Sequence, residues 1–252
     1  MAELDITIVV YALLACALGG LLKGATGAGA PVIGVPVLAA MFDVQFAVAV
    51  FVTPNLLTNV WQGWLFRKSM LPWPFLVLFA GGGGLGAIIG TYLLAGLPSH
   101  LLLVFMSLVV LGYVGFRLLN ADWGLSYPVG IKLAGPAGLL GGILQGATGI
   151  SAPASLTFLN ALKLPRSCFI GTISLFFAVM SSTQIERMAA VGLLTFDRFL
   201  LGLGATAVTL AAMPVGSWLA TKVSRSTFDR IILGLLVLIA LKILMEVLVF
   251  RT

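Results

Sequence analysis

The sequence predicts an all-α integral membrane protein made of two homologous repeats, each a broken re-entrant helical hairpin followed by three transmembrane helices. Of its 252 residues, 60% are hydrophobic and only 9% are charged, whereas a soluble domain carries about 25% charged residues. Several apolar runs approach the ~20 residues that a helix needs to cross the hydrocarbon core of a membrane. A motif of thirteen residues also occurs twice, at matching places in the two halves of the chain.

The repeated motif is rich in glycine and closes with a proline in both copies. It reads GGLLKGATGAGAP at Gly19–Pro31 and GGILQGATGISAP at Gly141–Pro153, 122 positions later, with nine of thirteen positions identical. Glycine and proline interrupt helices, and a membrane tolerates an interrupted helix only where the freed backbone is buried in protein or lines a cavity. Matching interruptions in two halves of a chain therefore indicate the binding site of a transporter.

Helix lengths explain why each break is expected to form a hairpin rather than two spans. As one helix, the stretch from Ile6 to Phe42 would be ~55 Å long, against a hydrocarbon core of ~30 Å. We expect a first repeat over residues 1–125 and a second over 126–252. The first repeat contains the hairpin 6–42 and the spans 45–66, 74–94 and 101–119. The second repeat contains the hairpin 130–162 and the spans 167–190, 199–220 and 228–250.

The basic residues predict the orientation of these segments, because lysine and arginine gather in loops on the cytoplasmic side. If the hairpins do not cross, each half crosses an odd number of times and the repeats are inverted. Nine basic residues then fall on one side and three on the other, whereas full crossing by the broken segments would give seven and five. We therefore expect inverted repeats with both termini outside the cytoplasm. The nine are Arg67, Lys68, Arg117, Lys132, Lys163, Arg166, Lys222, Arg225 and Arg230, and the three are Arg187, Arg198 and Arg251.

Each break is a candidate anion site. A short helix that starts after a break offers free N–H groups and the positive end of the helix dipole. Lys23, a cation well inside an apolar segment, lies just before the first break, and Gln145 takes its place before the second. The alternative interpretation is a tight packing corner, with Lys23 extending to an interface. The candidate binding residues at the two breaks are Lys23, Thr26, Gly27, Gly29, Gln145, Thr148, Gly149 and Ser151.

The helix after each hairpin carries polar side chains along one face. Asn55, Asn59 and Gln62 are spaced i, i+4 and i+7, which places them on one side of a helix. Amides in an apolar helix are costly to leave unpaired, so they either bond neighbouring helices or line a polar path, and both interpretations remain open. The second half has a thinner stripe, in which Gln184 matches Gln62 at the offset of 122; its members are Ser174, Ser181 and Gln184.

The sequence holds little material for catalysis or metal binding. It contains one histidine and eight acidic residues, and no HExxH, GxSxG, P-loop or CxxC pattern. The two cysteines lie in apolar stretches and indicate neither a disulfide framework nor a metal cluster. The net charge of +6 lies mostly at helix ends, where it sets orientation. We expect no enzyme, no cofactor and no nucleic-acid partner.

At its two motifs the chain resembles the sulfite exporter TauE/SafE family of bacterial membrane permeases for sulfur-containing anions. The resemblance rests on GATGAGAPVIGVPVL at Gly24–Leu38, on the second motif, and on the duplicated helix plan. Family members often show a fuller glycine triplet after the first motif glycine, where this chain has Gly27-Ala28-Gly29-Ala30 and Gly149-Ile150-Ser151-Ala152. The resemblance implies transport of sulfite, sulfoacetate or related organosulfonates, commonly outward, by a multi-pass protein of the bacterial inner membrane.

The residues alone indicate a small anion held between two broken helices, and three functions remain open. The first is a secondary transporter driven by the gradient of a proton or another ion. The second is an anion channel with the same filter. The third is a membrane-embedded enzyme or assembly factor without transport, which the shortage of titratable groups disfavours. The expected partners are the anionic substrate and the lipid bilayer, with a coupling proton and a homodimer left open.

Overall fold

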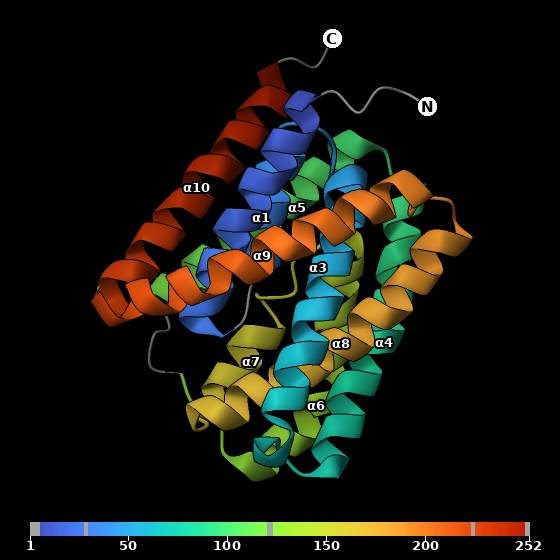
Figure 1. Ribbon diagram of the computed structural model, residues 1–252. Coiled ribbons are helices and arrows are strands. Elements are labelled where there is room, and N and C mark those ends of the chain that lie inside the picture. Colours follow the sequence, from blue (N-terminus) through green and yellow to red (C-terminus); the bar gives the residue numbers. More distant parts are fainter. Residues whose placement is uncertain (1–5, 28–29, 120–122, 223–224, 250–252) are drawn as a thin grey trace.

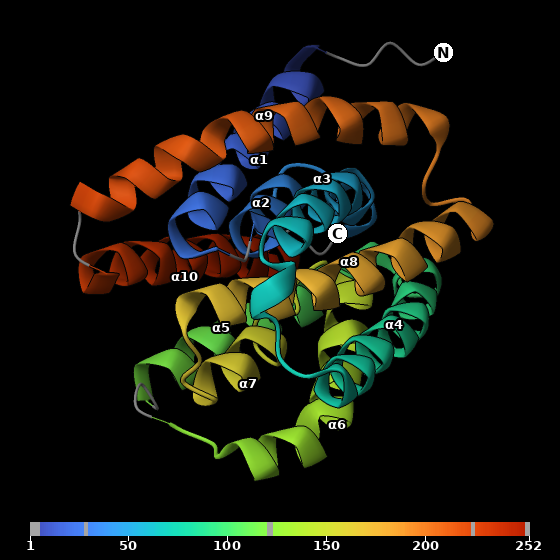
Figure 2. The ribbon, with the colours of Figure 1, turned by 60° about the horizontal axis from the view of Figure 1, so that its bottom comes forward.

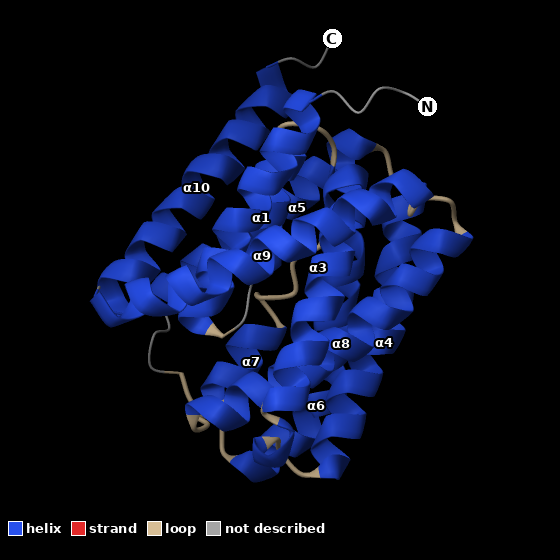
Figure 3. Cartoon of the chain, in the orientation of Figure 1, coloured by secondary structure: helices blue, strands red, loops and turns tan. Residues whose placement is uncertain are grey.

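The computed structural model describes residues 6–27, 30–119, 123–222 and 225–249 (Figure 1). Helices account for nearly all of this part of the chain, and no strand occurs in it (Figure 3). The predicted all-α architecture is therefore confirmed. Within the described ranges, seven helices are long and apolar enough to cross a membrane, so the chain is a multi-pass membrane protein. These seven are α1, α3, α4, α5, α6, α8 and α9, with bounds as given below.

The helices follow one order in both halves: a long helix, a short helix, then three long ones. The first and last residues of each expected span lie within three positions of the ends of an observed helix. The first half contains α1 (Ile6–Thr26), α2 (Ala30–Ala39), α3 (Val44–Leu65), the 3₁₀ turn η1 (Arg67–Ser69), α4 (Trp73–Gly96) and α5 (Ser99–Leu119). The second half contains α6 (Tyr127–Thr148), α7 (Ser155–Ala161), α8 (Arg166–Ala190), α9 (Phe196–Lys222) and α10 (Arg225–Val249).

Local sequence sets the helix ends around the breaks. The side chain of Asp43 accepts a hydrogen bond of 2.7 Å from the backbone N–H of Phe46, which caps the start of α3. α1 and α6 end because the next glycine, Gly27 or Gly149, takes a left-handed conformation with φ of 83° or 73°. In each case the glycine N–H donates to the carbonyl of Lys23 or Gln145, at 2.7 Å. The two GATG motifs thus stop their helices in the same way.

The two halves of the chain are interleaved. α4 of the first half packs along α6 of the second, and α9 of the second packs along α1 of the first (Figures 1 and 2). α3 packs against α8 in the middle of the molecule, and α5 packs against α10. Each hairpin is therefore covered by a helix from the other half.

Close backbone contacts between these helix pairs recur at constant offsets. A Cβ atom added to Gly24 of α1 would meet the carbonyl oxygen of Met213 in α9. One added to Gly146 of α6 would meet the carbonyl oxygen of Ala87 in α4. The positions differ by 122 in one helix and by 126 in the other. The contact of Gly20 with Thr209 is repeated at these offsets by that of Gly142 with Gly83. The contact of Gly216 with Leu21 is repeated by that of Gly90 with Ile143. The same helix–helix contact is thus built twice.

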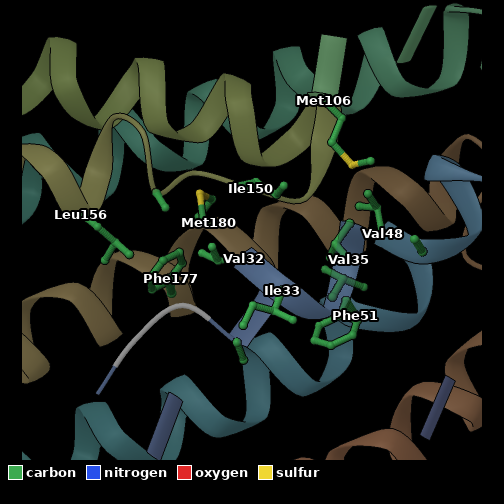
Figure 4. Close-up of a cluster of buried hydrophobic side chains, with 14 of the residues drawn as sticks. Val32, Ile33, Val35, Val48, Phe51, Met106, Ile150, Leu156, Phe177 and Met180 are labelled. Carbon is green, nitrogen blue, oxygen red and sulfur yellow. The ribbon is translucent and has the colours of Figure 1, made fainter. Parts of the chain in front are cut away.

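The part of the apolar core drawn in Figure 4 lies where α2, α7 and the second break meet α3 and α8. Val35 and Phe51 come from α2 and α3, Leu156 from α7 and Phe177 from α8, and all belong to one cluster of buried side chains. Ile150, in the segment that follows the second GATG motif, lies in the same cluster and is 1% exposed. The second break is therefore part of the hydrophobic core.

The first turn of α1 and the last turn of α10 lie at the same end of the molecule (Figure 1). η1 and the start of α6 lie at the opposite end. The predicted topology places both termini on one side of the membrane, and this arrangement of α1 and α10 is compatible with it. The orientation of the repeats remains a prediction.

Candidate functional site

Lys23 is fully buried, although its side chain ends in an ionisable amino group. It lies in the last turn of α1, one residue before the first GATG motif, and is 0% exposed. Its Nζ donates a hydrogen bond of 2.7 Å to Oδ1 of Asn59 in α3. In the part of the chain that the structure describes, no carboxylate lies within ion-pair distance of this ammonium group. The cation is thus held by a neutral amide.

A chain of hydrogen bonds continues from Asn59 across α3 to α8. Nδ2 of Asn59 donates to Oδ1 of Asn55 at 2.9 Å and to the Asn55 carbonyl at 2.6 Å. Nδ2 of Asn55 in turn donates to Oγ of Ser181 at 2.9 Å. The polar face expected from the i, i+4 spacing is therefore a buried network that joins α1, α3 and α8. Of the two alternatives that the sequence left open, the structure shows the bonding between helices at Asn55 and Asn59, and the polar path remains a prediction.

Three glutamines of the candidate set are buried with an unpaired amide oxygen. Oε1 of Gln62, Gln145 and Gln184 makes no hydrogen bond within the described chain. A buried polar group without a partner costs about 1–3 kcal/mol, so such atoms indicate water, an ion or a ligand. Nε2 of Gln184 donates to the backbone carbonyl of Gln145 at 3.4 Å, which joins the Gln184 side chain of α8 to the α6 backbone.

A pocket of about 570 Å³ lies beside the first break. Gly24 and Gly27 of the first motif form part of its wall, together with Gln62 of α3. Arg166, the first residue of α8, supplies the charged group of the lining, and Ser217 of α9 adds a hydroxyl. The remaining walls are apolar and come from Trp61, Leu65, Phe66, Ile170, Leu210, Met213 and Pro214. Four helices, α1, α3, α8 and α9, thus surround a space that reaches the interrupted helix.

The other candidates at the first break are placed less centrally. Thr26 is exposed, and its hydroxyl donates to the carbonyl of Leu22 in its own helix at 2.9 Å. Gly29, which was also predicted to contact the anion, lies outside the described residues. Gly27 is buried, and a Cβ atom there would lie 2.6 Å from the Ile170 side chain of α8. The first break therefore offers Gly24 and Gly27 to the pocket.

At the second break, the candidate residues lie inside packed protein. A Cβ atom on Gly149 would lie 3.0 Å from Val35 of α2 and 3.1 Å from Val48 of α3. The hydroxyl of Thr148 donates to the carbonyl of Leu144 at 2.7 Å and accepts from the N–H of Ile150 at 3.3 Å.

The hydroxyl of Ser151 accepts a hydrogen bond from Ser155 at 2.9 Å. The hydroxyls of Thr148 and Ser151 are therefore bonded locally, and the unpaired polar atoms near this break are those of Gln145 and Gln184.

The structure also brings residues to the site that the sequence did not single out. Arg166 was counted only as a basic residue that sets topology, and Ser217 was not singled out. Neither lies near the first break in sequence. The repeat could have drawn attention to Arg166. The matching residue 122 positions earlier is the apolar Val44, so the charge at Arg166 is a difference between the two halves.

Comparison with known proteins places the chain in a family. No curated protein and no solved structure shows significant similarity to it. The profile described as sulfite exporter TauE/SafE matches residues 12–243, which is nearly the whole chain and includes both breaks, the buried lysine and the pocket. On this match the chain belongs to the sulfite exporter TauE/SafE family.

Proposed function

We propose that the chain is a secondary transporter that exports small sulfur-containing anions, such as sulfite, sulfoacetate or other organosulfonates, across the bacterial inner membrane. Membership of the sulfite exporter TauE/SafE family and seven membrane-competent helices support transport of this class. The gradient of a proton or another ion is the proposed driving force. No catalytic role is proposed for any residue.

The observation that carries the proposal is the buried ammonium group of Lys23. Desolvating a charge costs several kcal/mol unless a partner of opposite charge compensates it. Lys23 has an amide, Asn59, as its hydrogen-bond partner and no carboxylate within ion-pair distance among the described residues. An anion held near the first break would supply the missing charge, and an ionisable residue inside a membrane segment is commonly functional. Lys23 is therefore proposed to bind the transported anion.

The interleaved packing supports a cycle in which access alternates between the two sides. The pair α1–α9 borders the pocket together with α3 and α8, and the pair α6–α4 repeats the α1–α9 contacts around the second break. If the repeats are inverted, the two breaks face opposite sides of the membrane. Opening one helix pair while the other is closed would then expose the bound anion to one side at a time.

Substitution of Lys23 tests the binding role. Lys23→Gln gives the first motif the residue that the second already has at Gln145, and it replaces the amino group by a neutral amide that can still donate a hydrogen bond. We expect sulfoacetate or sulfite to bind about 10- to 100-fold more weakly, equivalent to about 1.4–2.8 kcal/mol. Lys23→Arg keeps the charge and should retain part of the affinity. Calorimetry on the purified proteins measures the dissociation constants.

The control is Lys242→Gln, which removes an exposed lysine that pairs with Glu246 at 3.1 Å, far from both breaks in sequence. It should bind like the parent. Unchanged affinity in Lys23→Gln would remove this lysine from the binding site. In proteoliposomes, saturable flux with counterflow supports a transporter, whereas ohmic single-channel current would identify an anion channel instead.

Topology is tested by reporter fusions at both termini. We expect both reporters to lie in the periplasm, because nine of the basic residues then face the cytoplasm. A reporter inserted after Lys68, in the loop between α3 and α4, should give the opposite signal. A cytoplasmic reporter at the C-terminus would contradict the inverted arrangement.

A further inference from the structure

We propose that the pocket beside the first break is an entrance site that selects anions carrying an apolar group, with Arg166 binding the anionic head and the apolar wall holding the hydrocarbon part. This inference rests on the proposed transport of an anion and adds a receptor residue and a selectivity to it. Its observations are an unpaired arginine, an unpaired buried amide and a largely apolar cavity.

Arg166 is available for an anion. It is exposed and makes no hydrogen bond or ion pair within the described chain, and no acidic residue lines the pocket. A guanidinium group presents several N–H donors in a plane and binds planar or tripodal oxyanions with two hydrogen bonds at once. Because Arg166 is at the start of α8 and lines the same space as the first break, its charge lies at the pocket and not merely on a loop.

The polar side of the pocket connects Arg166 with the buried lysine. Gln62 is 6% exposed, lines the pocket and has an unpaired Oε1. It lies one helical turn after Asn59, which binds Lys23. The hydroxyl of Ser217 donates to the carbonyl of Gly24 at 2.9 Å, which joins α9 to the first motif at the same pocket. An anion could therefore pass from Arg166 along Gln62 toward Lys23.

The apolar side of the pocket explains the proposed selectivity. Trp61, Phe66, Leu210 and Met213 contribute walls to a volume of about 570 Å³, which lies in the range of ~300–1,000 Å³ typical of small-molecule pockets. Sulfite has four heavy atoms and would leave most of this space to water. An anion with a short hydrocarbon chain would bury that chain against these side chains, which is favourable for every methylene removed from water.

The position of the pocket fits loading of an exporter. Leu65 and Phe66, at the end of α3, immediately precede Arg67, and Arg166 begins α8. Arg67 and Arg166 both belong to the nine basic residues predicted on the cytoplasmic side. A site at this end of the helices receives its anion from the cytoplasm and leads inward to the break.

Calorimetry on the full chain in phosphatidylcholine nanodiscs tests the inference with sulfite and with methane-, ethane-, propane- and butanesulfonate. We expect affinity to rise up to about fourfold with each added methylene. Arg166→Gln should weaken every sulfonate about tenfold and lose most of the salt dependence of binding. Trp61→Ala should flatten the dependence on chain length, weakening butanesulfonate most and methanesulfonate least. Both residues are exposed, so these variants are expected to fold.

The matched control is Lys68→Gln, which removes an exposed charge at the same end of the molecule without touching the pocket. If Arg166→Gln binds as Lys68→Gln does, or if chain length has no effect on the parent, the entrance site is overturned even where Lys23-dependent transport persists. Adding phosphatidylglycerol to the nanodiscs tests whether the pocket binds a free sulfonate or the headgroup of an anionic lipid. Loss of Arg166-dependent sulfonate binding in its presence would assign the pocket to a lipid headgroup and overturn the proposal. A parent that neither binds nor moves any anion refutes the proposed function itself.

Discussion

The two breaks share a sequence and a backbone conformation, yet their surroundings differ. Gly27 and Gly149 have φ values of 83° and 73°, and each N–H bonds a carbonyl four residues earlier at 2.7 Å. The first break borders a pocket with Arg166 in its wall, whereas the second is packed by Val35 and Val48. The GATG motif therefore determines how the helix ends, and helices from elsewhere in the chain determine what the end is exposed to.

The helix pairs beside the breaks differ in glycine content. α4 carries Gly82, Gly86 and Gly90 at four-residue spacing, and Cβ atoms at these positions would collide with the α6 backbone. The matching positions of α9, 126 residues later, are Val208, Ala212 and Gly216. The backbones of α1 and α9 still touch at Gly24, as those of α4 and α6 do at Gly146. α9 thus differs from α4 by side chains at two of these three positions, and the α1–α9 pair borders the pocket.

The largest effect expected from the difference between the two halves is at Asn59 and its counterpart Ser181, 122 residues later. Asn59→Leu removes the partner of the Lys23 ammonium group, and an unpaired buried charged group costs more than ~3 kcal/mol. We expect sulfonate transport to fall about 100-fold while the protein remains inserted and monodisperse. Ser181→Ala removes only a neutral acceptor of Asn55 and should reduce transport less than tenfold. Equal losses in proteoliposome uptake would show that the two halves contribute alike.

Gln62 and Gln184 occupy matching positions but should differ in access. Gln62 lines the pocket, whereas Gln184 is 0% exposed and bonds the Gln145 carbonyl. In a chain with Cys168→Ser, we expect Gln62→Cys to react with a charged thiol reagent at least about tenfold faster than Gln184→Cys, because thiol reactivity requires access. Cys16 is buried and provides the background rate. Equal labelling rates would remove the difference between the two breaks.

The tightness of the two helix pairs is tested at Gly142 and Gly20, another pair 122 residues apart. A Cβ atom on Gly142 would collide with the backbone of Gly83. A Cβ atom on Gly20 would lie 2.5 Å from the carbonyl oxygen of Thr209. We expect Gly142→Ala to destabilise the protein by about 1–3 kcal/mol and Gly20→Ala by less. Thermal unfolding in detergent measures both.

Gly135→Ala is the control for Gly142→Ala, because both residues are in α6 and nothing lies within 4 Å of a Cβ atom added to Gly135. It should be neutral or slightly stabilising, because alanine favours the helix over glycine. A larger loss in Gly20→Ala than in Gly142→Ala would show that the α1–α9 contact tolerates an added methyl group less well than the α4–α6 contact.

Much of the helical plan could be predicted because it depends on local sequence. The breaks stop their helices through glycine, and Asn55 and Asn59 lie one turn apart on α3, so they bond each other. The pocket could not be predicted, because its wall combines α1, α3, α8 and α9. Gln62 and Gln184 are the same residue in matching positions, and only the helices packed around them distinguish their surroundings. Arg166 looked like a topology signal, since nothing local connects it with Gly27.

The interleaving of the halves has a consequence for biosynthesis. Ser217 of α9 bonds the Gly24 carbonyl, and Thr209 bonds that of Cys16 at 3.3 Å; both contacts join residues 193 positions apart. A ribosome that adds ~5–20 residues per second needs about 10–40 s to make that length of chain. During this time α1, with its buried lysine and interrupted end, has no α9 beside it. The newly inserted first half must therefore be sheltered by lipid or by the insertion machinery until the second half is almost complete.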